Sequence, residues 1–144
     1  MATLTILDDY QNVALTSADW TTVQQQYTVE VVTSHLADEA ALVSRMAASE
    51  VVVAMRERTP FPARVLQQLP RLRLLVTTGA SNASIDVAAA GSLGIAVCGT
   101  SSSGNAVPEL TIGMIIALTR NFAAEDAAVR AGGWQHTIGP GLAG

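Results

Sequence analysis

Five short runs rich in Val, Ile and Leu recur along the chain and predict β-strands. They cover residues 4–9, 27–34, 50–55, 73–78 and 94–100. Their apolar residues follow one another without strict alternation, which is typical of strands covered on both faces. The pattern predicts an α/β fold built on a parallel sheet of about five strands.

Helical patterns fill the intervals between these strands. Residues that cap or open helices mark four starts: Ser17 or Asp19, Asp38 with Glu39, Pro60 with Pro62, and Asp86. Strands and helices that alternate through short connections place helices on both sides of a parallel sheet.

From residue 105 onward the pattern changes to one long helix, or two joined helices, over residues 107–133. Its apolar residues lie on more than one helical face, so the helix has to be buried from several directions. Half of the ten residues after Trp134 are Gly, Pro or Ala, and the ten are too few to cover it. We therefore expect a second domain or a second subunit to cover this helix.

The composition is that of a globular chain with a sizeable core. Of 144 residues, 49% are hydrophobic and 14% are charged, and the formal net charge is −4. A mildly acidic chain without a basic patch is a poor candidate for binding nucleic acid or an anionic membrane. The low charged fraction favours a surface that a partner or another domain covers.

The sequence favours a cytoplasmic protein. Cys98 is the only cysteine, which excludes an internal disulfide or a thiolate metal cluster and fits a reducing compartment. The start of the chain lacks the positive charge and the long apolar run of a secretion signal. The most apolar stretch, residues 112–118, is shorter than the roughly 20 residues of a membrane span.

The chain closes on GPGLAG, residues 139–144, which has the glycine spacing of a dinucleotide-binding loop. Such a loop needs a strand before it and a helix directly after it, whose N-terminus holds the pyrophosphate. Residues 134–138 form a weak strand pattern, and Pro140 has no amide hydrogen to donate. We interpret GPGLAG as a flexible connector.

Polar loops after the predicted strands carry the candidate binding residues. TTGASNASID, residues 77–86, follows a strand at the carboxyl edge of the sheet, where small ligands bind, but a plain turn explains it equally well. Arg56 or Arg58 can pair with an anionic substrate or can be solvated at a helix start. Asp8 and Asp9 suit a turn cap better than a metal site.

Two further groups of polar residues have candidate roles. Residues 100–105 (TSSSGN) precede the long helix, where they favour either anion binding or N-capping by Ser103 or Asn105. His35 and His136 have no evident acidic partner motif, and we predict that both are surface residues.

Five stretches, in order and at the expected spacings, carry a resemblance that covers essentially the whole chain. They are ILDDYQNVA, VVVAMRERTPFP, LRLLVTTGASNASIDVAAAGSLGIAVCGT, PELTIGMIIALTRN and RAGGWQ. The chain resembles the D-isomer-specific 2-hydroxyacid dehydrogenases, specifically the N-terminal part of phosphoglycerate-dehydrogenase-like members. The resemblance implies a flavodoxin-like, three-layer substrate domain over residues 1–104, with an interdomain helix and connector over residues 105–144.

In this family the chain continues into an NAD-binding Rossmann domain, and its last segment returns to the substrate domain. The resemblance places the glycine fingerprint and the family's catalytic Arg, Glu and His beyond Gly144. It implies a truncated chain whose parent enzyme reduces 2-oxo acids, or oxidises D-2-hydroxy acids, with NAD or NADP. We expect this fragment alone to bind no cofactor and to have no activity.

The resemblance also assigns site residues. For the substrate they are Gly79, Ala80, Ser81, Arg56 and Tyr10, and for the cofactor they are Asn105 and Ala106. The backbone amides of Ala80 and Ser81 hold the substrate carboxylate in this assignment, and fixed amides need no side-chain ordering. Ser81 and Ala83 replace a glycine and an acid that many relatives carry, which leaves the choice of substrate open.

Other modules share the alternation of five strands and helices. A phosphoacceptor receiver domain needs an Asp after the third strand and a Lys after the fifth, but this chain has Met55 and Arg56 at the first place and no Lys. A flavodoxin needs a phosphate loop rich in Ser, Thr and Gly where this chain has DDYQNVA. One alternative stays open: an autonomous flavodoxin-like binding module that forms homodimers through residues 107–131.

Overall fold

The computed structural model describes residues 1–101 and 104–142, which form two compact units. The first unit is Met1–Ser102 and the second is Ser103–Gly144. Two residues singled out in the sequence, the candidate cap Ser103 and the last glycine of GPGLAG, Gly144, lie outside the described residues.

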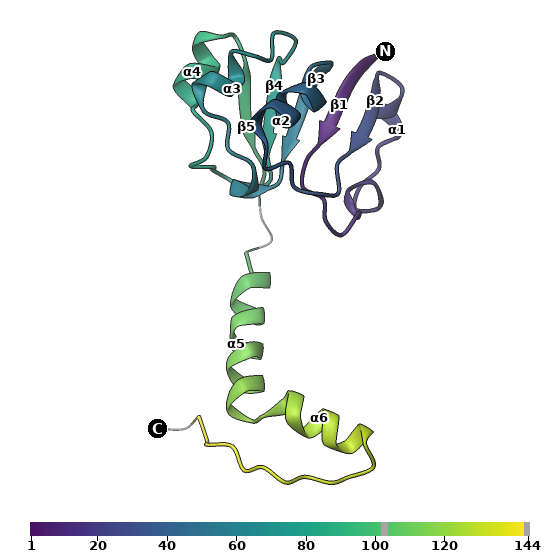
Figure 1. Cartoon of the computed structure of the whole chain (residues 1–144), viewed down its shortest axis with the longest axis vertical. Helices are drawn as coiled ribbons and strands as arrows, with labels where there is room; N and C mark the ends of the chain where they lie inside the picture. The colour runs from purple at the N-terminus through teal and green to yellow at the C-terminus, as the bar shows by residue number, and fades with distance from the viewer. Residues whose placement is uncertain (102–103, 143–144) are drawn as a thin grey trace. The chain divides into compact units, whose positions relative to one another are not determined.

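The first unit contains a five-stranded, all-parallel sheet in the order β2-β1-β3-β4-β5 (Figure 1). Its strands are β1 (Ala2–Ile6), β2 (Tyr27–Val31), β3 (Ser49–Ala54), β4 (Leu74–Thr77) and β5 (Ala96–Gly99). Each strand overlaps one of the predicted runs. The predicted α/β fold with a parallel sheet is therefore confirmed.

Two strands end earlier than their apolar runs because the backbone turns into the left-handed region. Asp8 has a φ of 56° shortly after β1, and Arg56 has a φ of 54° shortly after β3. A residue in this conformation cannot continue an extended ladder, and it is uncommon for any residue other than glycine. Residues 7–9, predicted as strand, therefore form part of a loop.

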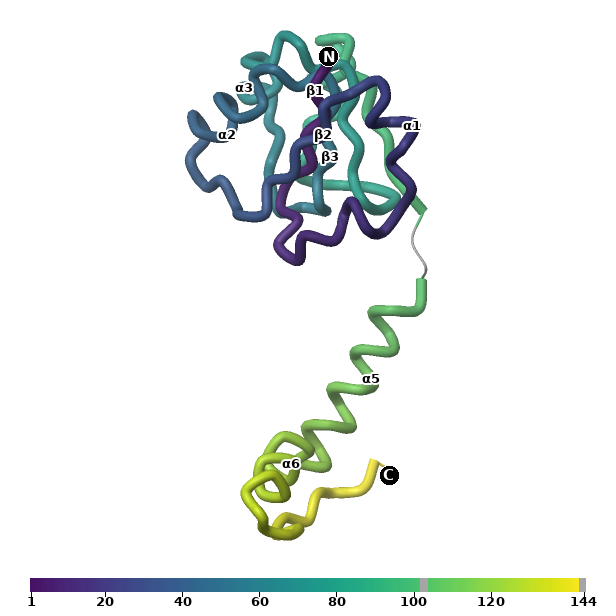
Figure 2. Tube along the Cα trace, turned by 90° about the vertical axis from the view of Figure 1, so that its right-hand side faces the viewer, coloured from purple at the N-terminus to yellow at the C-terminus, as the bar shows by residue number. Residues whose placement is uncertain are grey.

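Helices cover the two faces of the sheet unequally. They are α1 (Thr21–Gln24), α2 (Glu39–Met46), α3 (Ala63–Leu66) and α4 (Val87–Ser92). Figure 2 shows α2 and α3 on one side of the sheet and α1 on the other. The main core lies under α2, α3 and α4, and its buried members include Met46, Val52, Phe61, Leu66, Leu75 and Ala90.

A smaller apolar cluster lies on the opposite face. Leu4, Ile6 and Val51 are buried there, with Trp20 packed against them. Over β4 and β5 this face is more open, since Leu74 is half-buried and the next strand exposes its residues.

Asp38 and Asp86 are N-cap residues, as the sequence predicts, whereas Asp19 lies one residue before Trp20, the N-cap residue of α1. The side chain of Asp38 accepts a hydrogen bond from Ala41 N at 2.7 Å, and that of Asp86 accepts one from Ala89 N at 2.9 Å. Asp19 accepts from Thr21 at the start of α1, and the Thr21 hydroxyl and amide lower the pKa of Asp19 below its ordinary value. Each bond satisfies a donor that the helix end leaves free.

The second unit contains two helices, α5 (Ala106–Thr119) and α6 (Phe122–Arg130). They are separated at Asn121, whose φ of 54° ends the first helix, and asparagine adopts this conformation more readily than most residues. None of the described residues of α5 is buried. The exposed apolar side chains include Val107, Leu110, Ile112, Met114, Ile115 and Leu118.

No helix in the described part of the chain has the length and apolar content that a membrane crossing requires.

Candidate functional site

The loops that follow β1, β3, β4 and β5 meet at one edge of the sheet, because parallel strands have their carboxyl ends on the same side (Figure 1). In open α/β sheets this edge is where ligands bind. Residues 79–84, which follow β4, form the part of this edge that we call the anchor loop.

The anchor loop is fastened to the end of β5. Gly79 N donates to the Thr100 hydroxyl at 2.9 Å, and Thr100 N donates back to the Gly79 carbonyl at 2.9 Å. Gly79 has a φ of 124°, and a Cβ atom there would collide with the guanidinium of Arg56. The backbone conformation therefore favours glycine at this position, and any larger residue would displace the flexible end of the Arg56 side chain.

The anchor loop leaves backbone donors free. Within the described residues, the amides of residues 80–83 donate no hydrogen bond. Ala80 and Ser81 are exposed, whereas Asn82 is buried. A cavity of about 400 Å³ adjoins them, with Ile85 and Val97 among its apolar lining residues. Free amides beside a partly apolar cavity suit a small anion that carries an apolar or neutral body.

Arg56 belongs to this site through its side chain and its backbone. Its guanidinium lies against Gly79, at the start of the anchor loop. Its only ionic neighbour among the described residues is Glu57, at 3.9 Å from Nε, and the Arg56 side chain is 59% exposed. A pair this long and exposed contributes little, so the Arg56 charge remains available to a ligand.

Arg58, the other candidate arginine, is engaged elsewhere. Its Nη1 donates to the Asp8 carbonyl at 2.6 Å, and its guanidinium carbon lies 4.4 Å from the centre of the Tyr10 ring. This stacking on an aromatic face fixes the side chain at the end of β1. The structure thus separates the two arginines, with Arg56 at the anchor loop and Arg58 at Tyr10.

Asp8 connects the β1 and β3 loops, a role that the sequence did not indicate. Its buried carboxylate accepts from the Thr59 hydroxyl at 2.6 Å and the Tyr10 hydroxyl at 3.3 Å, and it lies 3.1 Å from His35 Nδ1. Partial burial and the nearby Asp8 carboxylate raise the pKa of Tyr10 above its ordinary value. His35 is exposed as predicted, but it has an acidic partner 27 residues away in sequence.

Asp9 is a turn cap, as the sequence predicts, and Asp8 is not. The two carboxylate oxygens of Asp9 accept from Val13 N at 3.1 Å and Ala14 N at 2.8 Å. In the part of the chain that the structure describes, no group of three His, Cys, Asp or Glu residues could hold a metal ion.

The remaining assigned residues lie in the second unit. Asn105 is the N-cap residue of α5 but its side chain makes no capping hydrogen bond, and Ala106 is the first residue of the helix. Both are exposed. The structure therefore groups Gly79, Ala80, Ser81 and Arg56 in one site, with Tyr10 at the same edge.

The glycines of GPGLAG lie at the end of the described residues. Residues 139–142 follow no strand in the described part of the chain, and a dinucleotide-binding loop follows directly on a strand. Gly139 packs against the Thr119 carbonyl, where a Cβ would collide.

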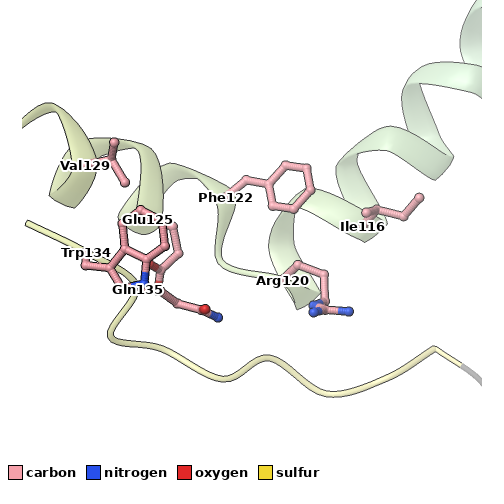
Figure 3. Close-up of a pocket in the computed structure, with 7 residues that line it drawn as sticks. All are labelled: Ile116, Arg120, Phe122, Glu125, Val129, Trp134 and Gln135. Atoms are coloured by element: carbon pink, nitrogen blue, oxygen red, sulfur yellow. The ribbon is translucent and has the colours of Figure 1, made fainter.

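A second cavity, of about 520 Å³, lies in the second unit (Figure 3). Ile116, Phe122 and Trp134 line it, and Trp134 is 80% exposed. Its one carboxylate, Glu125, accepts from the Thr137 hydroxyl and from Thr137 N at 2.7 Å. These bonds lower the pKa of Glu125 and fasten the segment after Trp134 to α6.

Acid is expected to release this segment. A carboxylate whose pKa is lowered by folding stabilises the fold above its unfolded pKa, and that contribution is lost as the pH falls through the lower, folded value. Trp134 fluorescence should therefore change at a pH below the ordinary glutamate range. Glu125→Gln should abolish this transition, whereas the adjacent Asp126→Asn should keep it. A transition that persists in Glu125→Gln contradicts this assignment.

Comparison with known proteins decides the family. The sequence profile of the family described as D-isomer specific 2-hydroxyacid dehydrogenase, catalytic domain, matches residues 6–133. The chain belongs to this family.

Individual dehydrogenases of this family agree with the match. The chain is 34% identical over 94 residues to a glycerate dehydrogenase of Methylorubrum extorquens. This alignment covers 65% of the chain and 29% of the relative. It is 33% identical over 94 residues to a glyoxylate/hydroxypyruvate reductase of Arabidopsis thaliana, covering 62% of the chain and 28% of the relative.

A solved structure extends the similarity to the whole chain. The crystal structure of a phosphoglycerate oxidoreductase from Vibrio cholerae O395 matches 100% of the chain with a TM-score of 0.87 and 33% identity. The match covers 47% of that protein. The chain thus spans less than half of this oxidoreductase and less than a third of the two curated relatives.

Proposed function

We propose that this chain is the substrate-binding part of an NAD(P)-dependent D-2-hydroxyacid dehydrogenase, an oxidoreductase that acts on the CH–OH group of small D-2-hydroxy acids. The observation that carries the proposal is the pair of exposed amides at Ala80 and Ser81, which bond to no described residue and follow directly on the Gly79 that contacts Arg56. Fixed amide donors and a guanidinium together suit a carboxylate.

The assigned residues divide the binding between them. The amides of Ala80 and Ser81 hold the carboxylate of the 2-oxo or 2-hydroxy acid, and Arg56 adds positive charge. Tyr10 forms part of the pocket wall, where Arg58 holds its ring in place. Asn105 and Ala106 face the cofactor of the parent enzyme. NAD or NADP therefore belongs to the parent, and this chain alone binds neither.

We infer that reduction of the 2-oxo acid depends on groups outside these 144 residues. The resemblance to the family places its catalytic Arg, Glu and His after Gly144. The purified chain should therefore show no oxidation of NADH with glyoxylate, followed by absorbance, although it binds the acid. Turnover above the rate without protein contradicts this division of labour.

The carboxylate requirement gives the test of the proposal. Titration of the chain with glyoxylate should show saturable binding by NMR, because its carboxylate accepts from the free amides. The neutral analogue glyoxylamide should bind at least about tenfold more weakly, since charge-assisted hydrogen bonds are roughly twice as strong as neutral ones. Equal binding of the two compounds excludes an anion site at the anchor loop.

Self-association is the second proposed property, and the apolar surface of α5 favours it. Leu110 and Leu118 are both exposed, together with apolar residues on other faces of the helix. An apolar surface of this kind is covered in stable soluble proteins, and a symmetric dimer covers it with a second copy. This property also fits the alternative of an autonomous binding module without catalysis.

Light scattering tests the expected homodimer. The chain should have the mass of a dimer at high concentration, and Leu110→Glu with Leu118→Glu should shift it to monomer by placing charges on the contact. Leu93→Glu, an exposed position in the first unit, serves as the control and should leave the dimer intact. A wild-type monomer at all concentrations contradicts the proposal.

A further inference from the structure

The backbone of Arg56 is held from two sides in a conformation that costs free energy. Its φ of 54° lies in the left-handed region, where residues other than glycine are strained. Arg56 N donates to the Thr78 hydroxyl at 3.1 Å, and the Arg56 carbonyl accepts from Asn82 Nδ2 at 2.6 Å. Both partners belong to the segment that follows β4, so this segment fixes the direction in which Arg56 leaves its strand.

Asn82 is the central residue of this arrangement. Its Nδ2 also donates to the Thr77 hydroxyl at 3.0 Å, and its Oδ1 accepts from Ser84 N at 2.9 Å. The residue is only 9% exposed, so its amide group uses these protein partners instead of water. One side chain thus joins the end of β4, the closing turn of the anchor loop and the backbone of Arg56.

The hydrogen bonds of Asn82 connect Arg56, which carries the guanidinium, with the segment that carries the backbone amides of residues 80 and 81. Two hydrogen bonds fix the residues directly before and after residues 80 and 81. Gly79 is bonded to Thr100, and Asn82 is bonded to the Arg56 carbonyl. The Arg56 guanidinium contacts Gly79, immediately before the free amides. The position of the charge relative to these amides therefore depends on the Asn82 side chain.

We propose that Asn82 is a positioning residue that joins Arg56 and the amides of Ala80 and Ser81 into one carboxylate-binding unit. This inference rests on the proposed function, because it concerns the same site. Asn82 itself does not contact the substrate. It holds the Arg56 backbone in the left-handed conformation, and without it the guanidinium is no longer kept beside Gly79, immediately before the two amides.

Two variants test the proposal by NMR titration of the intact chain with glyoxylate. Asn82→Asp keeps the shape but places a carboxylate oxygen against the Arg56 carbonyl, and Asn82→Ala removes the side chain. Both should weaken glyoxylate binding by about tenfold or more, as expected for loss of a buried hydrogen bond that fixes the site. Asn12→Asp, which has the same charge change at an exposed turn position, should bind within about twofold of wild type.

The side-chain resonance of Arg56 Nε–Hε distinguishes positioning from general destabilisation. In wild type it should be a single dispersed signal that shifts with glyoxylate. In the Asn82 variants it should move toward the position of a free arginine, while the signal of Arg58 stays in place. If Asn82→Asp does not fold, Asn82→Ala alone has to show both effects.

The outcomes separate this inference from the proposed function. If glyoxylate fails to bind wild type, the carboxylate site itself is wrong. If wild type binds and a folded Asn82 variant binds equally well, or keeps the wild-type Arg56 signal, the carboxylate site stands and the positioning role of Asn82 is overturned.

Discussion

Replacing Phe61 with alanine is expected to lower the free energy of unfolding of the first unit by about 3–5 kcal/mol, the cost of removing a phenyl ring from a packed core. Phe61 is 0% exposed and belongs to the main core. Because small domains are stable by only about 5–15 kcal/mol, this loss takes a large part of the total. Urea unfolding, followed by Trp20 fluorescence in a Trp134→Phe background, measures it.

The same substitution is expected to reach the binding site. The Phe61 amide donates to the Ser84 carbonyl at 2.7 Å, and its carbonyl accepts from Asp86 N at 3.0 Å, so its backbone fastens the end of the anchor loop. A core that relaxes around the missing ring loosens these bonds and weakens glyoxylate binding.

The only other phenylalanine is the matched control for this prediction. Phe122 is 55% exposed in the second unit, and its replacement by alanine should change the unfolding of the first unit by less than about 0.5 kcal/mol. Equal losses for the two variants contradict the assignment of Phe61 to the core of the first unit.

Gly79→Ala should remove most of the glyoxylate affinity, by about tenfold or more. A φ of 124° strains an alanine, and the added Cβ occupies the space of the Arg56 guanidinium. The arginine has to move away from the anchor loop, or the loop has to move away from β5. Either movement separates the charge from the amides, and an NMR titration compared with wild type measures the loss.

Gly94→Ala separates backbone strain from this collision. Gly94 also has a positive φ, of 74°, but nothing lies within 4 Å of a Cβ placed there. The variant should therefore lower stability and leave glyoxylate affinity unchanged. If Gly94→Ala weakens binding as much as Gly79→Ala does, the loss reflects general destabilisation and not the geometry of the site.

Local sequence signals predicted the fold well where a single residue type determines the outcome. Runs of Val, Ile and Leu placed the strands, and Asp38 and Asp86 placed two helix starts through their own capping bonds. The strand ends were harder to place, because the apolar run continues through Leu7 while the left-handed backbone of Asp8 ends the strand. That conformation depends on partners distant in sequence, which periodicity does not reveal.

The site shows the same division between local and distant signals. The anchor loop is a candidate from the sequence because a polar loop after a parallel strand is itself a local signal. The residues alone do not distinguish Arg56 from Arg58, since the difference depends on the Asp8 carbonyl, 50 residues away from Arg58. No local signal marks Asn82, whose proposed role depends on a bond to Arg56, 26 residues away.

Of the two predicted alternatives, one long helix or two joined helices, the structure has the second, with the break at Asn121. Residues 107–133 contain no proline or glycine at this point, so no breaker indicated where the chain would turn. The apolar character of α5 was a clear signal in comparison, and its described residues are exposed in the structure. This exposed apolar surface is the observation on which the proposed dimer rests.

The most direct test of the account is to locate glyoxylate on the wild-type chain by ¹⁵N-resolved NMR. We predict that the largest amide shifts on titration occur at Ala80 and Ser81, because these amides donate to the carboxylate. The Arg56 side chain should show a smaller response. Binding whose largest shifts fall elsewhere, for example around Trp134 in the second unit, with the amides of Ala80 and Ser81 unmoved, would contradict it.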